Sequence, residues 1–142
     1  IFEEMKDPNL AILNAYKTAL SNLKIGDLDI PVYSKSAPLK NVPKKYVILS
    51  SQTKLQNKTK CDYWYECTMT VQIVTRYPNG TGDLSFAMVI GEEIAEIIQV
   101  EGINIEDCRN IETMQLLSSE VILETDTENV FQYLLIFNHK LN

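Results

Sequence analysis

The sequence predicts an α+β fold, in which a mostly antiparallel sheet of about five strands carries two helices packed on one face. Two segments repeat apolar residues every three or four positions, as helices do, and the segments between and after them have the patterns of strands. Their order along the chain is α-β-β-β-α-β-β, which is typical of helices packed on an antiparallel sheet. With 142 residues, 45% of them hydrophobic and 23% charged, residues 1–142 are expected to form one domain.

The first helix is predicted over residues 8–23. Asp7 can cap it, and Pro8 suits a first turn in which no backbone N–H is needed. Gly26 then ends the helix in a turn. The apolar residues at helical spacing, which we expect to face the core, are Leu10, Leu13, Tyr16, Leu20 and Leu23.

Three strands are predicted next. Residues 30–33 are short and extended, and residues 46–49 form a strand after a proline-marked loop. Residues 50–62 are polar and rich in lysine, and we expect them to form a long hairpin loop. This loop leads to the longest strand, residues 63–77, with one buried face and one mostly polar face. The residues of the buried face are Tyr65, Cys67, Met69, Val71 and Ile73.

The second helix is predicted over residues 83–99, where Asp83 or Ser85 can cap its start and Gly102 ends it. Its outer side carries glutamates. The residues of its buried stripe are Ala87, Ile90, Ile94, Ile97 and Ile98.

Two further strands complete the sheet, residues 112–124 and 130–140, and residues 125–129 form the hairpin turn between them. The last strand is apolar on both faces. We therefore expect it to lie inside the sheet rather than at an edge.

No residue pattern predicts a catalytic site, a metal site or a cofactor. His139 is the only histidine, and a surface or packing role is favoured over catalysis. Cys67 falls in the apolar row of the long strand, as a small buried hydrophobe does. Glu92, Glu93 and Glu96 could bind a hard cation, and Glu92 and Glu96 share a helix face, but a solvated surface is the favoured interpretation. We therefore expect that the protein is not an enzyme.

The chain contains no apolar run of the roughly 18 to 20 residues that cross a bilayer, so no membrane is expected as a partner. Three cysteines without paired spacing suit a reducing compartment better than a disulfide framework. The first residues do not have the pattern of a signal peptide. The sequence begins without an initiator Met, which leaves open that residues precede Ile1.

Charge is sorted along the chain. Between Ile30 and Cys61 there are seven lysines and no acid, whereas from Tyr77 to Asn142 there are twelve acids and two basic residues. The net charge of −6 argues against general nucleic-acid binding. The lysines could simply solvate a loop, or they could meet glutamates of a second copy in a head-to-tail ring. The candidate residues for such a subunit or partner contact are Lys40, Lys44, Lys45, Glu92, Glu93 and Glu96.

The order of these segments resembles the tail-terminator, or tail-completion, family of long-tailed bacteriophages. The likeness runs from the opening helix and residues 30–33 through Tyr46-Val47-Ile48-Leu49-Ser50 to the long strand ending in Arg76-Tyr77, the second helix and the closing strand. In that family a P-x-Y-V phrase precedes a long polar hairpin. Here Pro43 stands three residues before Tyr46, which is a looser spacing.

The resemblance implies a structural virion protein without enzymatic activity. It implies a homo-oligomeric ring, with a hexamer favoured, that ends tail-tube polymerisation and joins the tail-tube protein to the head–tail connector protein. Its place would be the virion tail, after assembly in the host cytoplasm, with DNA passing through the lumen. Lys54, Lys58 and Lys60 would lie in a loop toward the lumen or a neighbouring ring, where any DNA contact would be nonspecific. The alternatives are another head–tail adaptor or tail-tube ring subunit, and a non-viral small binding module.

Overall fold

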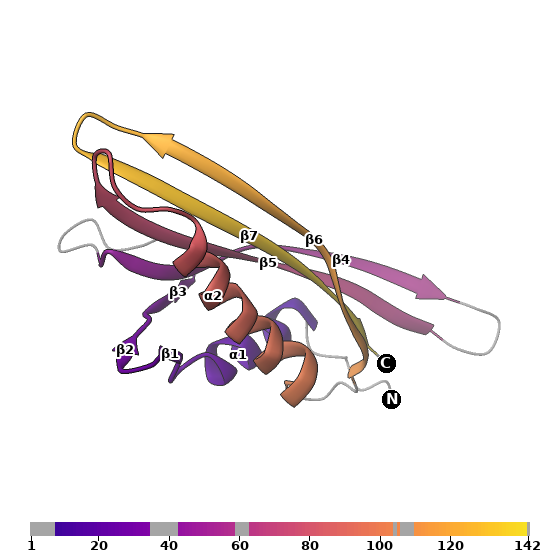
Figure 1. Cartoon of the computed structure of the whole chain (residues 1–142). Coiled ribbons are helices and arrows are strands. Elements are labelled where there is room, and N and C mark those ends of the chain that lie inside the picture. Colours follow the sequence, from indigo (N-terminus) through magenta and orange to yellow (C-terminus); the bar gives the residue numbers. More distant parts are fainter. Residues whose placement is uncertain (1–7, 35–42, 59–62, 104, 106–109, 142) are drawn as a thin grey trace.

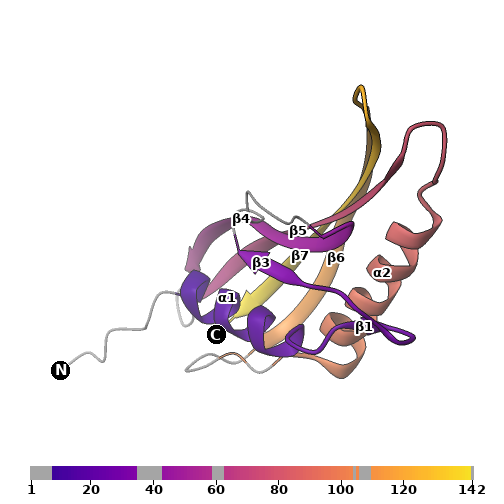
Figure 2. The ribbon, with the colours of Figure 1, turned by 90° about the vertical axis from the view of Figure 1, so that its left-hand side faces the viewer.

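Two helices cover one face of a five-stranded sheet in the computed structural model, which describes residues 8–34, 43–58, 63–103, 105 and 110–141. Figures 1 and 2 show both helices on the same side of the long, twisted strands. The predicted α+β fold is confirmed. The elements are α1 (Pro8–Ala19), β1 (Lys24–Ile25), β2 (Leu28–Asp29), β3 (Val32–Ser34), β4 (Lys45–Lys58), β5 (Tyr63–Pro78), α2 (Ser85–Ala95), the π-helical η1 (Glu96–Glu101), β6 (Asn110–Glu124) and β7 (Glu128–Leu141).

The strands of the main sheet lie in the order β3-β4-β5-β7-β6. β3 runs parallel to β4, and every other neighbouring pair is antiparallel. β7 lies between β5 and β6, so the prediction of an interior last strand is confirmed. Register shifts between Leu49 and Ser51 in β4, and at two points in β6, place bulges in these two strands.

Helix α1 forms where it was predicted, but it ends at Ala19, and its buried stripe includes Ile12 and excludes Leu10. Ile12 and Tyr16, one turn apart, are fully buried, whereas Leu10 is 56% exposed. Because the helix stops early, Leu20 and Leu23 are buried from the turn that follows it. Gly26 then adopts a positive φ of 61° in the turn of the small β1–β2 hairpin, which the sequence did not predict.

The polar segment after residue 50 is a strand, so the prediction of a loop over residues 50–62 is wrong for its described part. β4 continues to Lys58, and residues 51–58 each pair with a residue of β5. Strand pairing satisfies backbone N–H and C=O groups whatever the side chains are, so a polar sequence can extend a ladder that an apolar one begins. The hydroxyls of Thr53 and Thr68 add a hydrogen bond across the two strands.

The core lies between the sheet and the two helices. Alternate residues of β5 point into it, and Cys67, Met69, Val71 and Ile73 are fully buried there, as predicted. Helix α2 adds Ala87, Ile90 and Ile94 to the same cluster, and Ile98 follows from η1, whereas Ile97 is only partly buried. A second, smaller cluster of Tyr46, Val74 and Val130 lies apart from this core. Burying each large side chain contributes about 1.5–3 kcal/mol, so the core side of the sheet dominates the stability.

Candidate interaction surfaces

The two lysines at the start of β4 make contacts within the chain. The Nζ atom of Lys44 lies 3.5 Å from Oε2 of Glu128, and Nε of Arg76 lies 3.4 Å from the same oxygen. The Nζ atom of Lys45 lies 5.1 Å from the ring centres of both Tyr77 and Phe86. One carboxylate thus faces two cations, and Lys45 adds cation–π attraction between the sheet and the start of α2.

The other candidate lysines are divided by the fold. Lys54 is an exposed residue within β4, and Lys58 is the last residue of that strand. Neither lies in a loop, because β4 is longer than predicted. Lys40 and Lys60 lie outside the described residues. The lysines at residues 44–45 and at residues 54–58 therefore stand near opposite ends of one long strand (Figure 1).

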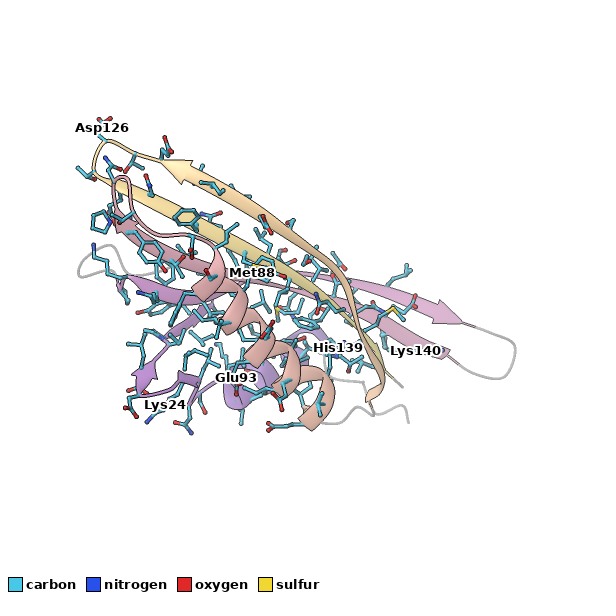
Figure 3. All side chains as sticks on the ribbon, viewed as in Figure 1. Lys24, Met88, Glu93, Asp126, His139 and Lys140 are labelled. Carbon is cyan, nitrogen blue, oxygen red and sulfur yellow. The ribbon has the colours of Figure 1, made fainter. Side chains whose placement is uncertain are left out.

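The acidic candidates lie on helix α2. Glu92 and Glu96 are exposed, as predicted, while Glu93 is partly buried. Figure 3 shows how the side chains of α2, Glu93 among them, are arranged in front of the sheet. Within the part of the chain that the structure describes, no three His, Cys, Asp or Glu side chains gather closely enough to hold a metal ion.

The β6 edge carries a surface that sequence reasoning missed. Glu120 and Glu124 are exposed there, and the three residues between them, Val121, Ile122 and Leu123, are 39%, 56% and 47% exposed. These residues belong to the projecting β6–β7 hairpin, whose tip is marked by Asp126 in Figure 3. The sequence did contain a signal for this surface, namely three consecutive apolar residues, bracketed by acids, in a predicted strand. Successive side chains of a strand point to opposite faces, so three apolar residues in a row place apolar side chains on both faces.

The turn at the tip of this hairpin is well defined, and it forms where the sequence predicted it. The backbone N–H of Thr125 donates to the carbonyl of Glu128 over 2.8 Å, and the Thr125 hydroxyl accepts from the backbone N–H of Glu128 over 2.9 Å. These bonds tie the ends of β6 and β7 together, so the exposed strand end is held by its own turn.

His139 is part of the core and not of a surface. It is fully buried, and its Nε2 lies 2.5 Å from the Tyr16 hydroxyl, while Nδ1 lies 3.2 Å from Oγ1 of Thr113. With Tyr16 donating to Nε2, the ring proton sits on Nδ1 and faces Thr113, so both ring nitrogens have partners. Burial lowers the pKa of His139 to about 4 and raises that of Tyr16. Both groups are therefore neutral at pH 7.

Open grooves border both helices. One, of about 410 Å³, runs along α1 and is lined mainly by small residues such as Ala11, Ala15 and Gly102. A smaller one, of about 110 Å³, lies between α2 and the sheet beside Met88 and Gln115. None of the helices in the described ranges is long and apolar enough to cross a membrane.

The whole chain has a counterpart among solved structures. A chain in the structure described as "Virion of native gene transfer agent (GTA) particle" matches with a TM-score of 0.74, over 96% of this chain and 98% of that one. The two chains share a fold. Their sequences are 13% identical, so the likeness concerns the fold and not particular residues. No protein-family model matches the sequence, and neither does any curated protein.

Proposed function

We propose that this protein is a structural component of a phage-like virion, which forms a ring at the junction of tail and head. In that place it ends polymerisation of the tail tube and joins the tail to the capsid connector. The observation that carries the proposal is the match to a virion chain over nearly the full length of both proteins. The phage tail-terminator pattern in the sequence supports the more specific place within the particle.

The arrangement of charge supports assembly from identical copies. Lys54 and Lys58 lie on β4, at one side of the sheet, whereas Glu92 and Glu96 lie on α2 and Glu120 and Glu124 on the opposite sheet edge. Opposite charges on different sides of one subunit favour a head-to-tail contact, which gives a ring when each step rotates the next copy by a fraction of a turn. We favour six copies, the number that the phage resemblance suggests.

Lys54 and Lys58 of β4 have a second proposed role in such a ring, which is contact with DNA. If Lys54 and Lys58 border the lumen, they contact the phosphate backbone of the passing DNA without reading its sequence. The acidic remainder of the chain limits adhesion to that DNA. Binding of this kind weakens steeply as salt is added.

The first test is the assembly state of the purified protein. We expect rings in negative-stain electron micrographs and a hexameric mass in native mass spectrometry at micromolar concentration and low salt. Addition of the protein to polymerising tail-tube protein of the same particle should shorten the tubes and leave a ring at one tube end.

Other results would contradict the proposal in distinct ways. Rings that incorporate along the tube would identify a tube subunit, and rings that bind only the capsid connector would identify a head–tail adaptor. A protein that stays monomeric, both alone and with tube protein present, would favour a small binding module.

A further inference from the structure

Both sides of the main sheet end in open strand edges. β3 covers the outer edge of β4 only along Val47, Ile48 and Leu49, and among the described residues no strand borders residues 51–58 of β4 on that side. On the other side, β6 is the last strand of the sheet along its whole length. An open edge presents backbone N–H and C=O groups in the spacing that another strand needs, so each edge can accept one.

The end of β6 has only part of the protection that edge strands usually have. Edges are normally blunted by charged side chains, above all lysines, or by prolines or bulges, and the charged residues of this stretch are two glutamates, Glu120 and Glu124. The two bulges of β6 lie before Ser118, and residues 118–124 pair with β7 in unbroken register. Residues 118–124 contain no lysine or proline, and the three residues between the two glutamates, Val121, Ile122 and Leu123, are exposed by more than a third. A regular edge with three exposed apolar residues is suited to accept a partner strand.

Direction and charge both suit β4 of a second copy as that partner. β4 is antiparallel to β5, β5 to β7, and β7 to β6, so β6 runs opposite to β4. A second copy placed with its sheet in the same orientation therefore brings its β4 antiparallel to β6. The sequence of β4 contains three lysines and no acid, and that of β6 contains three glutamates and no basic residue. The exposed Leu55 of β4, beside Lys54, supplies an apolar partner.

We propose that residues 118–124 of β6 in one copy pair antiparallel with the open part of β4, residues 51–58, in the next copy. Backbone hydrogen bonds join the two sheets, Val121, Ile122 and Leu123 lose their exposure to water, and Glu120 and Glu124 lie near the lysines of β4. In Figure 1 the β6–β7 tip and the far end of β4 project toward opposite ends of the molecule, so this contact is head-to-tail and cannot be satisfied within one copy. The inference rests on the proposed ring and names the surface that builds it.

Charge reversal on each strand tests the contact. The variant Glu120→Lys with Glu124→Lys, and the variant Lys54→Glu with Lys58→Glu, each place like charges across the contact, and we expect self-association at least about tenfold weaker by sedimentation velocity. An equimolar mixture of the two variants should restore association in a ring in which the two variants alternate. In both kinds of contact in that ring, lysines of one variant face glutamates of the other. The chain that carries all four reversals should associate with itself for the same reason.

The matched control for the β6 variant is Asp27→Lys with Glu101→Lys, which changes the net charge by the same amount at exposed positions away from both edges. It should assemble as the original protein does, and circular dichroism should show every variant folded. Rings that persist in the β6 variant would overturn this inference and leave the proposed function standing. Failure of the mixture to associate would show that the acidic edge meets a surface other than β4. An absence of rings in the original protein, both alone and with tube protein present, would overturn both proposals.

Discussion

The buried imidazole of His139 couples the last strand to the first helix. Its two ring nitrogens meet Tyr16 of α1 and Thr113 of β6, so one side chain links three elements that are far apart in the sequence. A neutral ring fits this site because both partners are uncharged hydroxyls. Protonation would place a cation in the core without a carboxylate among these partners, and that is costly.

Stability should therefore fall as the pH drops below about 6.5. The pKa of His139 is lowered to about 4 in the fold, so between these values the unfolded chain binds a proton that the folded chain does not. The contribution of neutral His139 to the free energy of unfolding is complete above pH 6.5 and decreases by about 1.4 kcal/mol per pH unit down to about pH 4. Urea unfolding at pH 7, 6 and 5 measures this loss. In the variant His139→Gln, the free energy of unfolding should change much less with pH between pH 6.5 and pH 5. An unchanged pH dependence would mean that groups other than His139 cause the loss of stability.

Helix α2 approaches β7 closely at Gly91. Gly91 is buried in the middle of the helix, and a Cβ atom added there would lie 2.8 Å from Cε2 and 3.1 Å from Cδ2 of Tyr133. Glycine is a poor helix former, so its presence at this position is explained by the close approach of helix and strand.

Gly91→Ala should destabilise the protein, because the clash with the Tyr133 ring outweighs the better helix propensity of alanine. Overpacking costs about 1–3 kcal/mol, against about 1 kcal/mol gained in the helix. Thermal unfolding measures the net effect. In a chain that also carries Tyr133→Leu, the ring is absent and the same Gly91→Ala change should become stabilising. If the sign does not reverse, the close contact is not the reason for the glycine.

The elements differ in how far the sequence could predict them. β5 and α2 have strong apolar periodicity and β7 is apolar on both faces; all three form near where they were expected, and the expected faces of β5 and α2 are buried except for Tyr65 and Ile97, which are partly buried. The second half of β4 could not be predicted in this way, since its side chains are polar and its strand structure comes from pairing with β5. Of the predicted stripe of α1, Tyr16 faces the core, whereas Leu10 is exposed and Ile12 takes a core position that was not predicted, because the sheet lies on its side of the helix.

The candidate surfaces were predictable only in part, for a related reason. Glu92 and Glu96 are exposed as expected. The sequence could not indicate that Lys44 faces Glu128, because that pair forms between residues 84 positions apart, from 44 to 128. It also could not indicate which strands lie at the edges, since edge position depends on the order of strands in the sheet.

At the scale of the whole molecule, the distribution of charge predicts that self-association depends on salt. The Debye length shortens from about 10 Å at 0.1 M to about 3 Å at 1 M, so attraction between lysine and glutamate surfaces weakens. We expect the ring population, measured by sedimentation velocity, to decrease between 0.05 M and 0.5 M NaCl. The chain that carries all four charge reversals should have the same salt dependence, because the reversals exchange the signs of the two surfaces and keep the attraction between them. Association that rises with salt would indicate a contact governed by the apolar residues alone.

If copies pair edge to edge as we propose, the two open edges also determine what limits the size of the assembly. Each copy that covers one edge brings an identical uncovered edge with it, so the strength of the contact gives no signal to stop adding copies. Growth ends only when the last copy reaches the first, and this depends on the angle between successive sheets. That angle is set by backbone twist and by bulges such as the one between Leu49 and Ser51. Copy number is thus a property of strand curvature, separate from the residues that provide affinity.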